Sequence, residues 1–202
     1  ITDGPDTANI NETDTELIAS GTLAVSDVDT TDVVTASRTL AVTGSSDRSD
    51  AAAPSDAELL NMFTLDPTTV LDGTQTSSTL NWDFKSGSEA FDYLAVGETL
   101  ILTYTVNATD DDGTPLSESE TVTITITGTN DGPTAVADLN TTAENSTLTV
   151  DADNGVLTND TDPDTTDTLT VSEVAGDGSN IGSGVAGSDG GTFTIASDGS
   201  YT

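Results

Sequence analysis

Apolar and hydroxyl-bearing residues alternate along several stretches of the chain, a pattern typical of half-buried β-strands. The clearest stretch is 121–127, where valine and isoleucine occupy every second position and threonines fill the others. Residues 99–106 alternate in the same way, and the acidic loop 110–115, which contains glycine and proline, separates the two stretches. This arrangement predicts an antiparallel hairpin.

The remaining pattern predicts short strands and two isolated helical turns. Strands are expected at residues 21–25, 33–42, 63–65 and 79–84. One turn of helix is expected at 57–62, capped by Ser55 or Asp56, and another at 89–94, capped by Ser88. Neither helix is long enough to form a layer, so we predict an all-β protein built as a Greek-key β-sandwich. The alternation places Trp82 on the apolar face of its strand, which predicts a place in the core.

An internal repeat predicts two tandem modules. The sequence ITDGP at 1–5 returns as TNDGP at 129–133, and DTTD at 29–32 returns at 164–167. We therefore place one β-sandwich at 1–132 and a second at 133–202. The second module has no counterpart of the predicted hairpin, so we expect it to be truncated, or split by an inserted domain, at its C-terminal end.

Charge excludes several classes of function. The 202 residues include 36 Asp and Glu but only 3 Lys and Arg, with no histidine or cysteine, and the formal net charge is -33. Arg38, Arg48 and Lys85 cannot form the positive patch that nucleic acid or an anionic membrane surface requires. Thiolate and imidazole metal sites are ruled out as well. No stretch approaches the ~20 apolar residues of a membrane span, and the start does not read as a signal peptide, so we expect an excerpt of a longer protein without direct membrane insertion.

The acidic residues gather in loops that strand order assigns to the ends of the sandwiches. The loops 27–32 and 110–112 should lie where the chain enters the first module, while Glu12 and the segment 89–92 should lie at its exit end. The loop 160–164 should lie at the entry end of the second module. Two carboxylates ~4 Å apart repel by roughly 4 kcal/mol at an effective dielectric near 20.

Calcium is the cation that these loops fit, because Ca²⁺ takes 6 to 8 oxygen ligands in irregular geometry, whereas Mg²⁺ demands a small octahedral cage. We predict several bound Ca²⁺ ions and no other cofactor. The predicted ligands are Asp3, Glu12, Asp27, Asp29, Asp92, Asp110, Asp112, Asn130, Asp131, Asp160, Asp162 and Asp164.

Three alternatives remain open at the level of sequence. The acids could form a hydrated coat, as on proteins adapted to high salt. The chain could instead be a Ca²⁺-dependent module that binds sugar, protein or a second copy of itself, although it has no aromatic cluster for stacking on a sugar. Paired carboxylates also occur in glycosidases, but no pocket-forming insertion accompanies them here, and we predict that the chain is not an enzyme.

Several segments resemble a known family of bacterial modules. AVSDVD at 24–29, EAFDYLAVGE at 89–98, TYTV at 103–106, DDDG at 110–113 and ITITGTND at 124–131 together resemble the VCBS-type repeat of large repeats-in-toxin adhesins. Residues 134–202 resemble a cadherin-like bacterial immunoglobulin module, through GVLTNDTDPD at 155–164 and DGSYT at 198–202.

The resemblance implies an extender segment of a secreted bacterial surface protein. Such adhesins leave the cell by type I secretion and are anchored to the Gram-negative outer membrane through other parts of the protein. Their extender modules project a distal domain that binds a glycan or cell-surface protein in adhesion or biofilm formation. The partners implied are neighbouring modules of the same adhesin, and we expect a monomer. Calcium lies at module junctions in cadherin-like tandems, a role that Asn130 and Asp131 fit.

Overall fold

The computed structural model describes residues 1, 6–188 and 190–202. Asp3, one of the predicted ligands, lies outside the described residues. The chain divides into two compact units, unit 1 from Ile1 to Asn130 and unit 2 from Asp131 to Thr202. None of the helices in the described part has the length and apolar character that a bilayer span requires.

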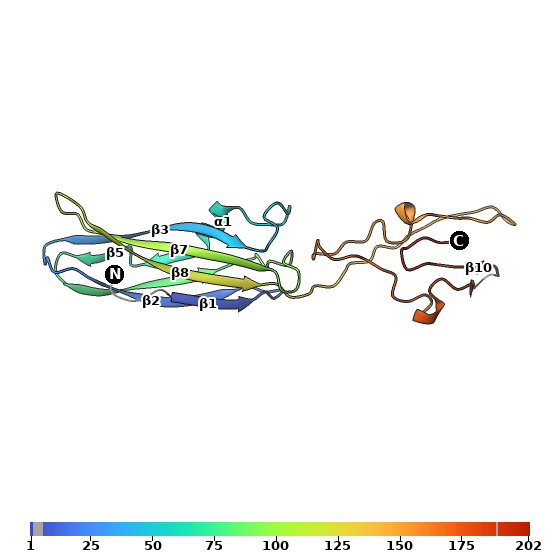
Figure 1. Cartoon of the computed structure of the whole chain (residues 1–202), viewed down its shortest axis with the longest axis horizontal. Coiled ribbons are helices and arrows are strands. Elements are labelled where there is room, and N and C mark those ends of the chain that lie inside the picture. The colour runs from blue at the N-terminus through green and yellow to red at the C-terminus, as the bar shows by residue number, and fades with distance from the viewer. Residues whose placement is uncertain (2–5, 189) are drawn as a thin grey trace. The chain divides into compact units, whose positions relative to one another are not determined.

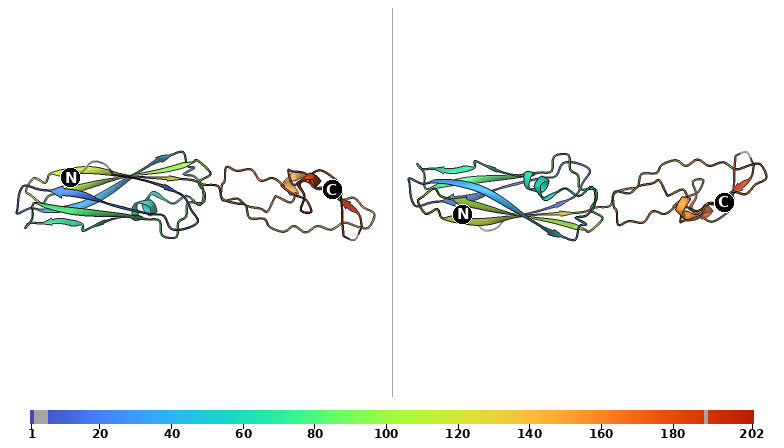
Figure 2. Two further views of the ribbon diagram at one scale, coloured as in Figure 1. Left: turned by 90° about the horizontal axis from the view of Figure 1, so that it is seen from below. Right: turned by 90° about the horizontal axis from the view of Figure 1, so that it is seen from above.

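Unit 1 is a sandwich of two sheets, as predicted (Figures 1 and 2). The five-stranded sheet has the order β1-β8-β7-β3-β5 and the three-stranded sheet has the order β2-β6-β4. Strand β1 runs parallel to β8, and the other neighbours are antiparallel. The strands are β1 (Asp6–Asn11), β2 (Ile18–Ser26), β3 (Val33–Gly44), β4 (Phe63–Asp66), β5 (Thr69–Asp72), β6 (Ser77–Lys85), β7 (Thr99–Thr109) and β8 (Ser117–Thr127).

The predicted hairpin is confirmed as β7 and β8, which pair from Thr99↔Thr127 to Thr109↔Ser117. Alternate side chains are buried from Leu100 to Ala108 in β7 and from Val122 to Ile126 in β8, while the side chains between them, mostly threonines, are partly exposed. The hairpin thus supplies a large share of the core, through Leu100, Leu102, Tyr104, Val106, Val122, Ile124 and Ile126. Burial of each such side chain contributes roughly 1.5–3 kcal/mol, which explains why the sheet forms without a disulfide or a helical layer.

Aromatic side chains fill the centre of this core. Trp82 is 3% exposed, which confirms its predicted place, and Phe63 stacks on it with ring centroids 5.7 Å apart. Phe63 also stacks on Tyr104 at 4.2 Å. The indole N–H of Trp82 donates a hydrogen bond of 2.7 Å to the carboxylate of Asp6 in β1. Gly21 lies opposite Trp82 in the ladder because a Cβ there would fall 2.6 Å from the indole ring.

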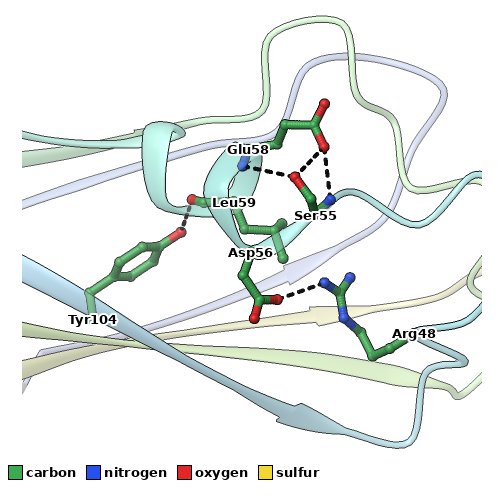
Figure 3. Close-up of polar contacts among 6 residues, drawn as sticks. All are labelled: Arg48, Ser55, Asp56, Glu58, Leu59 and Tyr104. Atoms are coloured by element: carbon green, nitrogen blue, oxygen red, sulfur yellow. Dashed lines mark hydrogen bonds and ion pairs between the residues drawn. The ribbon is translucent and has the colours of Figure 1, made fainter.

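The first predicted helical turn is confirmed as α1 (Asp56–Asn61), and Ser55 is its cap (Figure 3). The Ser55 hydroxyl accepts from the backbone N–H of Glu58 at 3.3 Å, while the Glu58 carboxylate accepts from the Ser55 N–H at 2.8 Å. This reciprocal capping box satisfies two donors that a helix start leaves unpaired. The hydroxyl of Tyr104 donates to the Leu59 carbonyl at 2.7 Å and so ties the helix to the core.

The second predicted helical turn is wrong. Residues 86–98 between β6 and β7 form a series of turns, and Phe91 has a φ of 68°, which is incompatible with a right-handed helix. Phe91 and Leu94 are both fully buried, so core packing outweighs the local helix signal. The segment lies against Gly128, where a Cβ would overlap the Leu94 carbonyl oxygen.

Unit 2 has little regular structure. Its elements are two 3₁₀ turns, η1 (Ala152–Asn154) and η2 (Gly178–Asn180), and the short strands β9 (Val185–Ala186) and β10 (Thr192–Phe193), which pair in an antiparallel manner. Isolated bridges, including Val150↔Tyr201 and Ile195↔Tyr201, join its extended segments. Among its described residues, Val174 is the buried hydrophobic side chain. Unit 2 therefore relies far less on a hydrophobic core than unit 1 does.

Candidate metal centre

Glu12, which directly follows β1, is the most buried carboxylate of the candidate site in unit 1. Its backbone N–H continues the ladder by donating to the Thr127 carbonyl at 2.8 Å. Its side chain is 1% exposed, and the Oε2 atom accepts from both the N–H and the hydroxyl of Thr129, at 3.1 and 2.7 Å. The Oε1 atom is buried and has no hydrogen-bond partner among the described residues. A carboxylate oxygen in that position is costly unless an ion or water completes its coordination.

Asp14 and Asp92 bring two further carboxylates to Glu12. One oxygen from each of the three residues lies within 4.8 Å of the others. Asp14 is exposed, whereas Asp92, in the turns before β7, is partly buried. The Asp92 Oδ1 atom is also buried and, within the described part of the chain, lacks a partner. The site thus combines two unsatisfied acceptors with three negative charges.

The arrangement of these oxygens suits a hard divalent cation. At an effective dielectric near 20, two unit charges 4.8 Å apart repel by roughly 3 kcal/mol, and a cation between them turns that repulsion into attraction. Ca²⁺ binds carboxylate oxygens at ~2.3–2.6 Å and fills the rest of its shell with backbone carbonyls and water. Glu12 and Asp92 supply buried oxygens for such a shell, and Asp14 supplies one that faces solvent.

Glu89 is a further carboxylate in the segment between β6 and β7, which also carries Asp92. Partial burial raises the pKa of Glu89, and the nearby charges of Asp92 and Glu58 add to that rise. Its Oε1 atom accepts from the backbone N–H of Phe91 at 3.1 Å. Glu89 is therefore bound to the backbone rather than turned into the group formed by Glu12, Asp14 and Asp92.

A second acidic group lies in the loop between β2 and β3. Asp27, Asp29 and Asp32 each offer an oxygen within 4.8 Å of the others. Loss of hydration raises the pKa of Asp32, and neighbouring carboxylates, foremost Asp29 and Asp112, raise it further. The Asp27 carboxylate also accepts from the Asp29 N–H at 3.0 Å, a bond that shapes the loop.

The other predicted ligands of unit 1 are divided between turn formation and the surface. The Asp110 carboxylate accepts from the N–H groups of Asp112 and Leu116, at 3.3 and 3.1 Å, and so holds the β7–β8 loop. Asp112 is exposed and lies near enough to Asp32 to affect its pKa. Asn130, the last residue of unit 1, is exposed.

Within unit 2, the carboxylates of three predicted ligands accept hydrogen bonds from backbone N–H groups. The Asp164 carboxylate is 0% exposed and accepts from the Asp131 N–H at 2.8 Å. The Asp162 carboxylate accepts from the Asp164 N–H at 3.0 Å, and Asp160 accepts from the Val136 N–H at 2.7 Å. These bonds fix the loop 160–164 against the first residues of the unit.

Sequence reasoning missed Asp14 and Asp32. Asp32 lies in the acidic loop 27–32, so the sequence contained a signal for it, but its position in the group depends on how the loop folds back. Asp14 follows Glu12 by two residues, and only the turn at 12–17 brings it back towards Glu12.

Comparisons with known proteins give a family match for one part of the chain. Residues 130–202 match the family model described as bacterial Ig domain, which supports an immunoglobulin-like module of bacterial type in that part. A search of curated proteins finds no match. Among solved structures, the chain is similar to the ASH/PapD-like domain of human CEP192 (PapD-like domain 7), with 14% identity and a TM-score of 0.33. That similarity covers 59% of this chain and 80% of the other.

Proposed function

We propose that the chain is a calcium-stabilised structural segment of a secreted bacterial surface adhesin. In this role, tandem immunoglobulin-like modules hold a distal binding domain away from the cell. The match of residues 130–202 to bacterial Ig domains supports a module of this type. Ig-like families generally serve structural or binding roles rather than catalysis, and no catalytic step is part of the proposal.

One observation carries the calcium part of the proposal. Glu12 is 1% exposed and has a buried oxygen with no partner among the described residues, yet it lies within 4.8 Å of Asp14 and Asp92. A hydrated coat of acids would keep such oxygens in water, whereas a coordinated cation satisfies them. The group formed by Asp27, Asp29 and Asp32 is a second candidate for an ion, because one oxygen of each residue lies within 4.8 Å of the others.

Calcium would act by joining segments that are distant in sequence. Glu12 directly follows β1, and Asp92 precedes β7, so an ion bound to both would fasten the edge strand to the β6–β7 segment. Extracellular modules bind Ca²⁺ with a Kd of roughly 10⁻⁴–10⁻³ M. The sites would therefore remain empty at the low calcium level of the cytosol and fill after export. The formal charge of -33 would oppose folding until then.

Thermal denaturation of the whole chain, in 10 mM CaCl₂ and separately in EGTA, tests the proposal. The CaCl₂ concentration is about tenfold above the weaker of these Kd values. Each filled site adds about 1.4 kcal/mol at tenfold excess of ligand over Kd, and several sites add together. We expect a Tm several degrees higher in calcium. Equal Tm values, with no calcium binding by titration calorimetry, would show that the acids are a hydrated coat.

A further inference from the structure

The backbone at Phe91 adopts a conformation that its side chain disfavours. Its φ of 68° lies in the left-handed region, where residues with a Cβ are uncommon. Phe91 is nevertheless fully buried in the core of unit 1. The surrounding contacts must therefore hold this turn, and the residue that follows it is Asp92, a candidate ligand.

Glu89 makes the contact that fixes the turn from its N-terminal side. Its carboxylate Oε1 accepts from the Phe91 N–H at 3.1 Å, and its own N–H donates to the Ser86 carbonyl at 3.2 Å. Ser86 is in turn bonded to Leu17, through its N–H at 3.0 Å and its hydroxyl at 2.9 Å. These bonds connect the Phe91 turn to Leu17, the residue directly before β2.

The C-terminal side of the turn is fixed as well. The Leu94 N–H donates to the Phe91 carbonyl at 2.9 Å, and Leu94 is fully buried. With the Phe91 ring in the core, the left-handed backbone at this residue redirects the chain, so that the Asp92 carboxylate lies close to those of Glu12 and Asp14. Any relaxation of φ at Phe91 would rotate the Asp92 carboxylate away from them.

We infer that Glu89 is a positioning residue of the cation site: its carboxylate holds the Phe91 backbone turn and thereby aims Asp92 at Glu12. Glu89 acts through the backbone and is not itself a ligand. The inference rests on the proposed function, because it assumes that the group formed by Glu12, Asp14 and Asp92 binds calcium. It adds a residue outside the predicted ligand set.

The test is an NMR titration of the whole chain with CaCl₂, which follows the backbone amides of Glu12 and Thr129 as reporters of this one site. Glu89→Ala removes the acceptor, whereas Glu89→Gln keeps an oxygen that can accept from the Phe91 N–H. Glu98→Ala is the matched control, because it removes the same charge from the same segment. Substitution of residues that orient metal ligands typically lowers the affinity for the metal by about 10–100-fold.

We expect Glu89→Ala to weaken calcium binding at the reporter amides roughly tenfold, and Glu89→Gln and Glu98→Ala to remain within about twofold of the unchanged protein. If Glu89→Ala does not give the spectrum of a folded protein, Glu89→Met takes its place, because it keeps the length of the side chain without an acceptor.

Each contrary result has its own meaning. Equal affinity in the acceptor-free variant and the unchanged protein would overturn the positioning role and leave the calcium site intact. A loss in Glu89→Gln as large as in Glu89→Ala would also overturn it, because charge rather than the hydrogen bond would then matter. If the reporter amides of the unchanged protein do not respond to calcium, the proposed site itself fails.

Discussion

Replacing Glu12 with glutamine should raise the stability of unit 1 without calcium and reduce the stabilisation that calcium adds. In the unchanged protein, the Glu12 and Asp92 carboxylates lie within 4.8 Å of each other. At an effective dielectric near 20, two unit charges 4.8 Å apart repel by about 3 kcal/mol. The amide oxygen of glutamine can still accept from Thr129, and its NH₂ group can donate to Asp92. In EGTA we therefore expect Glu12→Gln to be the more stable protein.

Calcium should narrow this difference, because glutamine removes one charged ligand from the site. The unchanged protein gains about 1.4 kcal/mol from a site at tenfold excess of calcium over Kd, and the variant gains much less. For a unit of this size, 1 kcal/mol corresponds to a change in Tm of about 3–6 °C. The Tm of Glu12→Gln should thus lie a few degrees above that of the unchanged protein in EGTA, and its rise on adding calcium should be smaller by a similar amount.

The assay is thermal denaturation followed by circular dichroism, in matched EGTA and CaCl₂ buffers of equal ionic strength. Glu118→Gln serves as the control, since it removes one negative charge from the exposed start of β8, far along the strand from Thr127. Its Tm should shift equally in both buffers. If Glu12→Gln lowers the Tm equally in both buffers, Glu12 has only a structural role, and the reasoning from its buried oxygen is refuted.

Three further substitutions test the fold that supports the site. Tyr104→Phe removes the hydrogen bond to a helix carbonyl and should lower the free energy of unfolding by about 1–2 kcal/mol in urea denaturation; no change would mean that water replaces the bond. Gly128→Ala should cost about 1–3 kcal/mol through overlap with a backbone carbonyl, while Gly113→Ala, which has open space around it, should be nearly neutral; equal effects would contradict the close approach. Ser55→Ala should cost about 1 kcal/mol at neutral pH. The Ser55 hydroxyl and N–H lower the pKa of Glu58. The part of the contribution that the hydroxyl makes by donating to the Glu58 carboxylate is therefore present above the ordinary pKa of 4.5 and is lost as pH falls through the lowered value. The difference in free energy of unfolding between Ser55→Ala and the unchanged protein should shrink across acidic pH, and a constant difference would refute the linkage.

Strands with strict alternation could be predicted from the sequence because each residue's face follows from its position. The β7–β8 hairpin is the clearest case, with threonines on one face and core residues on the other. The strand β5 (Thr69–Asp72) was not predicted, because its two buried residues, Val70 and Leu71, are adjacent in sequence and give no alternating signal. A four-residue edge strand of this kind is formed by its pairing with β3.

The candidate site was only partly predictable, because its geometry depends on turns rather than on strands. The exit end of the first module was expected to carry Glu12 and Asp92, and the structure places their carboxylates in one group. The helix expected at 89–94 fails because the core takes in Phe91 at a left-handed φ, and no periodic pattern encodes that choice. Asp14 enters the group through the turn after β1, which sequence spacing alone does not reveal.

The contact between Asp6 and Trp82 gives this protein a built-in optical probe. The chain has one tryptophan, and its indole N–H is bonded to a carboxylate of the first strand. Intrinsic emission therefore reports on a single place, where β1 meets the opposite sheet. Detachment of that strand would alter the wavelength and intensity of this emission, so its docking can be timed without attaching a dye.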